Sequence, residues 1–274
     1  MKKNRKGTTI MKNKVKIYCL SSLLLTFILT LLRCVSLTAF YDIGLGYFNH
    51  ALVPTVMNVL FVLCTLWAVS ALILIPKFKI QTEFIPNELS IKGTSLFAAV
   101  LFLFSAASLF GSNGNSLFIP ICAIATLISA LFFILSLFDS KICASIRAFT
   151  SIALIASLTI ALAALYFDMT IAMNSPHKIH GSFAFMSAMI FALCETRTYL
   201  GNPLPRLHLA SSLLTFMLGI SFALSSVTFL ITAAPSPFVT NPIVLGNIGY
   251  IGIIIGISAY AAARSFTFNN TSEE

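Results

Sequence analysis

Eight long apolar runs constrain this chain of 274 residues more than any other feature. A helix needs about 20 apolar residues to cross the hydrocarbon core of a bilayer, with a range of about 17 to 25. Because lipid offers no hydrogen bonds to the backbone, such runs favour helices. The sequence therefore predicts an all-α, polytopic integral membrane bundle of eight transmembrane helices. The spans are expected at residues 17–39, 53–75, 93–110, 117–138, 146–167, 177–199, 207–232 and 243–263.

The composition indicates the same class of protein. Hydrophobic residues make up 58% of the chain and charged residues only 9%, whereas a soluble domain carries about a quarter charged residues. Most of the exterior must therefore face lipid. The net charge is +9, but no soluble basic domain exists, so nucleic acid is not an expected partner. The six cysteines lie in or beside apolar runs without C-x-x-C spacing, which is typical of packing residues.

The third span is the weakest of the eight, because only Ser95 to Phe110 is cleanly apolar. As a helix this piece would rise about 24 Å. We therefore expect either an earlier start or a locally thinned bilayer.

The basic residues assign a side to each loop. When the spans alternate, fifteen of the seventeen lysines and arginines fall on one side; the exceptions are Arg33, within the first span, and Lys178, in an opposite loop. The positive-inside rule then places both termini in the cytoplasm. The sequence predicts cytoplasmic tails at 1–16 and 264–274 around one bundle, 17–263, in the cell (plasma) membrane.

The first and fifth spans end in similar segments. "AFYDIGLGYFNHALVP" and "LYFDMTIAMNSPHKI" each contain two aromatic residues, then Asp42 or Asp168, then an asparagine and a proline. The two segments lie four spans apart, which would suit a 4+4 parallel repeat of the kind that transporters use. Helices one and five would then be neighbours.

The second of these segments also resembles part of a known family. "YFDMTIAMNSPHK", continued by "CETRTYLGNPLPR", is similar to an uncharacterised family of bacterial polytopic membrane proteins, in which "YFDM…MNSP.K" leads into a helix ending in "E.R..LG…PR". The matching residues are Tyr166, Phe167, Asp168, Met169, Met173, Asn174, Ser175, Pro176, Lys178, Glu195, Arg197, Leu200, Gly201, Pro205 and Arg206. The resemblance implies a membrane location and brings no assigned activity.

Arg33 lies within the first span, well away from its inner end. A charge at the bilayer centre costs about 2.5–3.5 kcal/mol on the insertion scale, and less near the interface, which a long side chain can reach by snorkelling. Snorkelling is one interpretation. The other turns Arg33 inward to pair with a carboxylate or an anionic ligand. The candidate outer polar cluster consists of Arg33, Asp42, Asp168, Asn174 and Lys178.

Three histidines, His50, His177 and His180, are expected on the same outer side. Imidazoles beside a carboxylate could bind zinc or another divalent ion, and a spacing of three places His177 and His180 on one helix face. Ordinary polarity at the membrane interface is the favoured interpretation. No metal ion and no cofactor is predicted.

Glu195 is the only glutamate near a span, close to the inner end of the sixth. A carboxylate there could couple transport to protons. The favoured hypothesis is an ion pair at the inner rim with Arg206 or Arg147.

Small residues recur along one face of each of the last three spans. The candidate packing residues are Gly181, Ala184, Ala188, Ala192, Gly219, Gly252 and Gly256. Such faces let helices approach closely in lipid, either as static packing or as a sliding interface. We expect these three helices to form one tight unit.

No catalytic motif is present, and no catalytic residue is predicted. The leading hypothesis is a small permease or transporter-like protein with a small-molecule or ion substrate. The alternative is a membrane scaffold or accessory subunit that binds another membrane protein or a second copy of itself. A membrane-embedded enzyme is the third and least favoured hypothesis. A continuous polar cavity would favour the transporter, and an interior of Phe, Leu and Ile alone would favour the scaffold.

Overall fold

The structure, a computed structural model, describes residues 2–42, 47–50, 52–75, 89–111, 118–138, 144–167, 175–232 and 248–268, with side chains from Lys14 onward. Within these ranges the chain forms eight helices, each long and apolar enough to cross a membrane. They are α1 (Lys2–Ala39), α2 (Leu52–Leu74), α3 (Leu89–Gly111), α4 (Phe118–Leu135), α5 (Ala144–Phe167), α6 (Pro176–Tyr199), α7 (Pro205–Thr232) and α8 (Ile248–Thr267). The predicted all-α, multi-pass helix bundle is confirmed.

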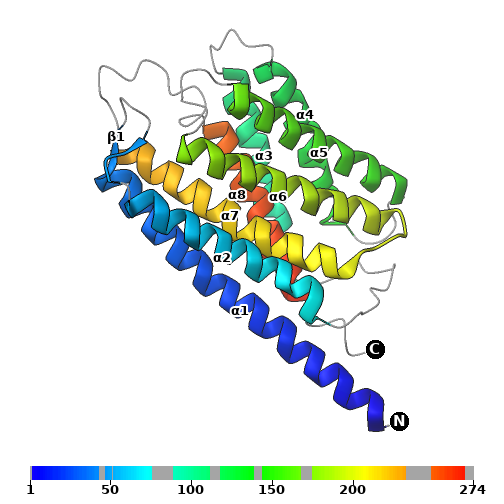
Figure 1. The fold of residues 1–274 in the computed structure, drawn as a ribbon. Helices are drawn as coiled ribbons and strands as arrows, with labels where there is room; N and C mark the ends of the chain where they lie inside the picture. Colours follow the sequence, from blue (N-terminus) through cyan, green and yellow to red (C-terminus); the bar gives the residue numbers. More distant parts are fainter. Residues whose placement is uncertain are drawn as a thin grey trace.

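A short antiparallel hairpin follows α1. Its two strands, β1 (Tyr41–Asp42) and β2 (Tyr47–Phe48), pair Tyr41 with Phe48. We call this end of the bundle, where α1 ends and α6 begins, the outer end, because the charge pattern predicts it to be external. The opposite end, where α6 ends and α7 begins, is the inner end (Figure 1).

Three helices depart from their predicted bounds by four residues or more. Helix α1 begins at Lys2 rather than at residue 17, so the segment predicted as an N-terminal tail is helical. Helix α3 begins at Leu89 rather than at residue 93, so an earlier start supplies the length that its apolar part lacks. The last was expected to end at residue 263, but α8 continues to Thr267. Arg264 thus belongs to the helix and not to a tail, because its charge is buried within the bundle.

Helices α3 to α8 form a closed ring. Each packs against the next in sequence, and α8 packs back against α3. Helices α1 and α2 lie outside this ring, against each other and along α7 (Figure 1). Helix α8, with contacts to α3, α6 and α7, is the most enclosed of the eight, and α2 is the least.

This arrangement does not confirm the 4+4 repeat. A parallel repeat would give α1 and α5 equivalent neighbours, but α1 packs against α7 and α2, whereas α5 packs against α4 and α6. The expected packing of α1 on α5 is not among the principal helix contacts.

Aromatic side chains fill the interior of the ring. The ring centroids of Phe102 and Phe133 lie 4.9 Å apart, and those of Phe133 and Tyr260 lie 5.3 Å apart. Phe191 of α6 reaches the same group, with its centroid 6.0 Å from that of Tyr260. The middle of the described bundle is therefore a packed apolar core.

The small residues lie where helices approach most closely. A Cβ atom on Gly181 would come within 2.7 Å of the Phe222 ring, and one on Gly219 would collide with Ser258 of α8. Gly252 and Gly256 face α3 instead, against Ser105 and Phe102. Ala184, Ala188 and Ala192 are fully buried. The tight unit therefore includes α3 as well as the last three helices.

The ends of α6 follow from the local sequence. Pro176 occupies the first turn, where its missing N–H costs no hydrogen bond. At the other end Gly201 adopts a φ of +79°, which glycine accepts without a steric penalty. The Gly201 N–H donates to the Thr198 carbonyl and the Asn202 N–H to the Arg197 carbonyl, a Schellman motif. Gly201 therefore caps the C-terminal end of α6.

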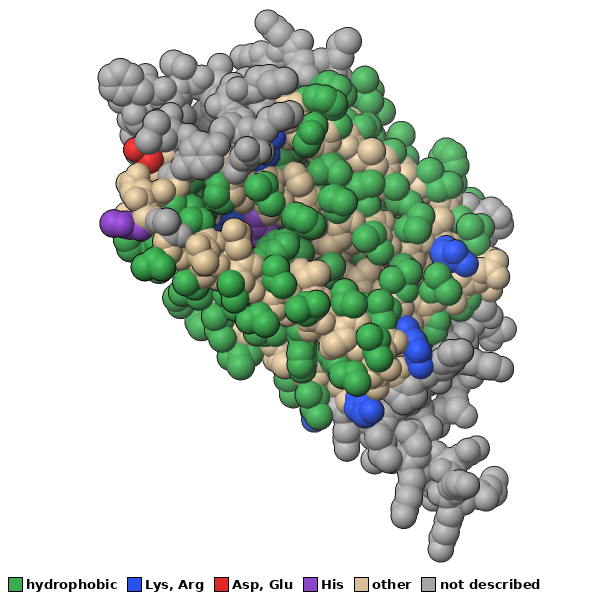
Figure 2. Space-filling view, viewed as in Figure 1, with side chains coloured by type: hydrophobic (Ala, Val, Ile, Leu, Met, Phe, Trp, Pro, Cys, Tyr) green, Lys and Arg blue, Asp and Glu red, His purple; other side chains and the backbone are tan. Residues whose placement is uncertain are grey.

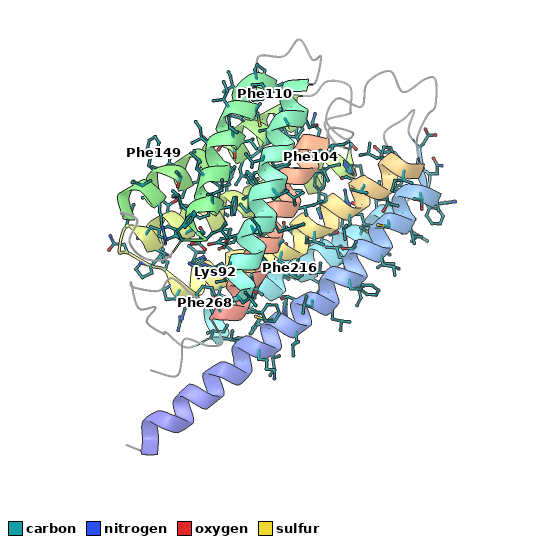
Figure 3. The ribbon with its side chains drawn as sticks, turned by 180° about the vertical axis from the view of Figure 1, so that it is seen from behind. Lys92, Phe104, Phe110, Phe149, Phe216 and Phe268 are labelled. Carbon is teal, nitrogen blue, oxygen red and sulfur yellow. The ribbon has the colours of Figure 1, made fainter. Side chains whose placement is uncertain are left out.

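The surface of the described residues suits a bilayer. Figure 2 shows mainly hydrophobic side chains along the length of the molecule, with lysine and arginine side chains gathered toward the end where the N-terminus lies. In Figure 3, Phe104, Phe110 and Phe149 point away from the bundle, and Phe149 is 69% exposed. In water, so extensive an apolar surface would promote aggregation.

Candidate functional site

The outer site is built around Arg33, which lies six residues before the end of α1, about 9 Å along the helix. Arg33 is only 4% exposed. The guanidinium Nε donates to the Ser225 Oγ at 2.7 Å, Nη2 donates to the His177 Nδ1 at 2.9 Å, and Nη1 donates to the His180 Nδ1. Helices α6 and α7 therefore hold an arginine that α1 supplies.

These contacts fix the form of both imidazoles. Arginine has only donors, so each Nδ1 must accept and each ring must carry its proton on Nε2. The Nε2 of His177 lies 3.5 Å from the Ser226 Oγ. The Nε2 of His180 is buried and has no hydrogen-bond partner among the described residues. We call Arg33, His177, His180, Ser225 and Ser226 the outer cationic cluster.

This cluster carries a buried positive charge. Among the residues that the structure describes, Arg33 forms no ion pair with a carboxylate. The Phe222 ring, with its centroid 6.0 Å from Cζ, offers a weak cation–π attraction. Each Nη atom keeps one N–H beyond its bond to histidine, and His180 adds an unpaired Nε2–H. The cluster presents donors and net positive charge, which is the chemistry of an anion site.

The structure describes three of the five residues of the predicted outer polar cluster, namely Arg33, Asp42 and Lys178. Asp168 and Asn174 lie outside the described residues, and Asp42, in β1, forms no ion pair with Arg33 within the described part of the chain. Lys178 is buried on α6 with its Nζ 6.0 Å from the centroid of the Tyr166 ring. Within the described part of the chain Arg33 bonds to histidine and serine, and its pairing with Asp168 stays a prediction.

The histidines divide into two roles. His177 and His180 both contact Arg33. Their spacing of three residues, which suggested a metal site, places both imidazoles against the guanidinium of Arg33. His50 is exposed and packs edge-on against Phe40, with 5.8 Å between ring centroids. No group of three or more metal-ligating side chains that could hold a metal ion is found in the part of the chain that the structure describes.

The inner site is built around Glu195, which is fully buried near the inner end of α6. Arg264 of α8 donates to it twice, from Nε to Oε1 at 2.5 Å and from Nη2 to Oε2 at 3.0 Å. The His208 Nε2 of α7 lies 3.1 Å from the same Oε1. A bidentate pair between arginine and carboxylate is among the strongest charge-assisted contacts. We call Glu195, His208 and Arg264 the inner lock.

The partners predicted for Glu195 are wrong. Arg147 donates from Nη2 to the carbonyls of Leu135 and Phe138 at 3.2 and 2.7 Å, at the end of α4, where helical carbonyls attract a cation. Arg206 donates to the Leu72 carbonyl at 3.3 Å. Both arginines thus stabilise helix ends, while the arginine of the last helix reaches the carboxylate.

The two clusters share one helix and are separated by apolar packing. His180 and Glu195 lie fifteen residues apart on α6, about 22 Å along its axis. Between them the buried side chains of α6 include Phe185 and Phe191. The ring of Phe191 also packs on His208, with 5.5 Å between centroids. The described residues show a cation at the outer end, an ion pair at the inner end and packed aromatic side chains between them.

Comparison with known proteins does not name either site. The chain matches no protein-family model, no curated protein and no solved structure. The resemblance to bacterial membrane proteins therefore stays a prediction from the sequence.

Proposed function

We propose that the protein is a small permease that takes an anionic substrate at the outer cationic cluster. One observation carries the proposal: Arg33 is buried with its charge balanced by no described carboxylate. Burying an ion without a partner costs several kcal/mol, so a fold that keeps Arg33 there gains when an anion supplies the missing charge. The unpaired Nε2–H of His180 gives that anion a further donor.

The inner lock supports this proposal by its position. It joins α6, α7 and α8 at the end opposite to the anion site. A permease must close one side while the other is open. Separating Arg264 from Glu195 would admit water to the inner end. Hydration of the two charged side chains would then offset part of the free energy lost with the ion pair. The inner lock would then be the gate, with the outer end external and both termini in the cytoplasm of a plasma membrane.

A membrane scaffold is the second candidate, and the packed core favours it. The rings of Phe102, Phe133, Phe191 and Tyr260 meet in the middle of the bundle. A permease must move these rings during its cycle, whereas a scaffold needs no such movement.

Transport into vesicles distinguishes the two candidates. The purified protein would be reconstituted in liposomes, and the uptake of radiolabelled phosphate, sulfate and a small dicarboxylate would be measured. We expect uptake of at least one anion, lost in Arg33→Gln and retained in Arg197→Gln, because Arg197 is exposed near the inner end of α6. Anions that neither cross the membrane nor stabilise the protein against heat would contradict the permease and leave the scaffold.

A further inference from the structure

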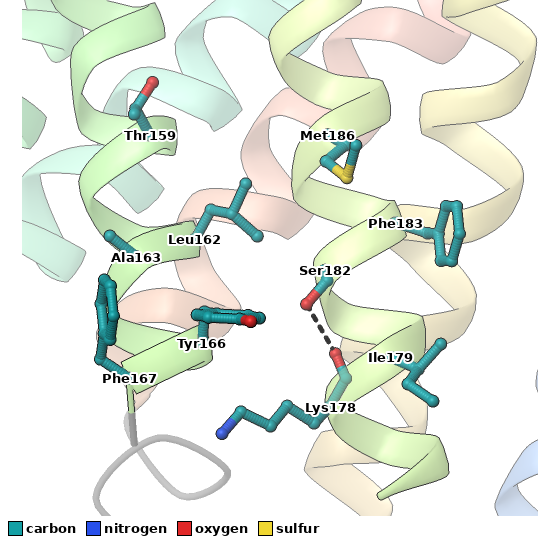
Figure 4. A pocket seen from close by; sticks show the side chains of 10 residues that line it. All are labelled: Thr159, Leu162, Ala163, Tyr166, Phe167, Lys178, Ile179, Ser182, Phe183 and Met186. Atoms are coloured by element: carbon teal, nitrogen blue, oxygen red, sulfur yellow. Dashed lines mark hydrogen bonds between the residues drawn. The ribbon is translucent and has the colours of Figure 1, made fainter. Parts of the chain in front are cut away.

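A groove separate from both polar clusters lies between α5 and α6. It has a volume of about 460 Å³ and opens on the outer surface of the ring. Pockets that bind small ligands have volumes of about 300–1,000 Å³ and are mostly apolar. Figure 4 shows Leu162 and Tyr166 of α5 and Ser182 of α6 pointing into it.

The length of the groove matches one leaflet of a bilayer. Its wall runs from Tyr166 to Thr159 on α5 and from Lys178 to Met186 on α6, which is about 10 Å and 12 Å of helix. Half of a hydrocarbon core measures roughly 15 Å. The groove therefore extends from the level of the headgroups through most of the hydrocarbon of a single leaflet.

The two aliphatic hydroxyl groups in the groove, those of Ser182 and Thr159, are already bonded within their helices. Ser182 Oγ donates to the Lys178 carbonyl at 2.9 Å, and Thr159 Oγ1 donates to the Ile155 carbonyl at 2.8 Å. Neither hydroxyl needs a partner inside the groove. The walls below its outer end thus present hydrocarbon surface, which suits an acyl chain better than a polar molecule.

The outer end of the groove has a different character. Lys178 is only 2% exposed, and its side chain lies across this end beside Tyr166 (Figure 4). An ammonium group has three donors, so any single contact leaves capacity for a phosphate oxygen. Tyr166 is 51% exposed, as suits a tyrosine at the membrane interface, where its ring meets hydrocarbon and its hydroxyl meets water. A cation above an apolar slot is complementary to an anionic amphiphile.

We propose that this groove binds an anionic phospholipid of the outer leaflet, with one acyl chain between α5 and α6 and the phosphate at Lys178. This site stands independently of the proposed permease function, because it shares no residue with the outer cationic cluster or with the inner lock.

Lipid binding to the purified full-length protein in detergent tests the proposal. Thermal unfolding and native mass spectrometry would compare phosphatidylglycerol with phosphatidylcholine of identical chains. We expect phosphatidylglycerol to bind more tightly and to raise the Tm further. Lys178→Gln should weaken phosphatidylglycerol about fivefold, the effect of one lysine near an anionic lipid surface, and should leave phosphatidylcholine unchanged.

A second variant tests the groove itself. Ala163→Phe fills the slot and should reduce the binding of both lipids; Ser182→Leu does the same from α6 if the first variant does not fold. The matched controls are Lys16→Gln and Ala107→Phe, at exposed positions on α1 and α3, which should bind both lipids as the wild type does. Equal binding of the two lipids by the wild type, or unchanged binding after the slot is filled, would overturn the proposal. Equal stabilisation by inorganic phosphate would also overturn it, because the acyl chain would then contribute nothing.

Discussion

Arg264 and Glu195 lie 69 residues apart in the chain and meet in two parallel hydrogen bonds inside the bundle. Neither side chain reaches solvent to any extent, at 3% and 0% exposure. Arg33 is buried to the same degree but holds only neutral partners. Arg147 is buried as well and donates to helix carbonyls. Arg264 and Arg33 differ in one respect that leads to the first two predictions: a described carboxylate balances the charge of Arg264, and none balances the charge of Arg33.

Replacing Arg264 with methionine should destabilise the protein strongly. The change leaves Glu195 buried with a single histidine contact, and breaking a buried ion pair costs about 3–5 kcal/mol. Unfolding of the purified protein, followed by circular dichroism during titration with a denaturing detergent, measures the loss. Arg197→Met is the matched control on the exposed side of α6. The double variant Glu195→Gln with Arg264→Met should recover part of the stability, because no unpaired charge remains; a double variant less stable than Arg264→Met alone would contradict this account.

Replacing Arg33 with methionine should cost less stability than the same change at Arg264. It removes a charge that no described carboxylate balances, and the groups left behind are neutral imidazoles and a hydroxyl. Each unpaired neutral group costs about 1–3 kcal/mol, and the loss of the buried charge offsets part of that. The same unfolding titration compares the two variants. A larger loss for Arg33→Met would show that Arg33 has an anionic partner in the free protein.

Substitution by alanine should lower the stability of the protein at Gly219 and raise it at Gly93, because the two glycines have different surroundings. At Gly219 the new methyl group meets the Ser258 side chain, and forcing an atom into a packed site costs about 1–3 kcal/mol. Gly93 lies in α3 with nothing within 4 Å of an added Cβ. Alanine there should stabilise the helix by up to about 1 kcal/mol. Melting temperatures of Gly219→Ala and Gly93→Ala provide the measurement, and a stabilised Gly219→Ala would show that α7 and α8 can separate freely.

Chemical labelling tests the sidedness on which the permease proposal relies. His50 follows the outer hairpin and Asn202 follows α6 at the inner end, and both are exposed. With an impermeant maleimide on intact cells, His50→Cys should react, and Asn202→Cys should react only after the membrane is permeabilised. The described native cysteines are buried or partly buried, and the unmodified protein gives the background. Reaction of Asn202→Cys in intact cells would reverse the orientation.

The structural features that could be predicted from the sequence are those that depend on a single helix. Apolar length determines whether a segment crosses a membrane, so eight spans could be counted. The small-residue faces of the last three spans need only helical spacing. Each of these features is visible within a single segment.

The contacts between helices could not be predicted in the same way. Glu195 was assigned to Arg206 or Arg147 because these lie near the inner rim by charge pattern, but pairing depends on which helices are neighbours and how each is rotated. Helix α8 turns Arg264 toward the interior of the bundle. From the sequence, Arg264 was expected just after the last span, whereas it lies within α8. For Arg33, the sequence suggested carboxylates because opposite charges attract, whereas α6 and α7 surround it with His177, His180 and Ser225.

The closure of the ring through α3 and α8 has a consequence for biosynthesis. Helix α3 enters the membrane early, yet the surface that receives Gly252 and Gly256 stays without its partner until the last helix is inserted. Membrane helices are first inserted individually and then associate, so a ribosome that stalls before α8 leaves Ser105 and Phe102 facing lipid or a chaperone. A nascent chain truncated after α7 should therefore be recognised as incomplete and degraded, even though seven of its spans are present. The packing of α3 is thus completed only by the last helix of the bundle.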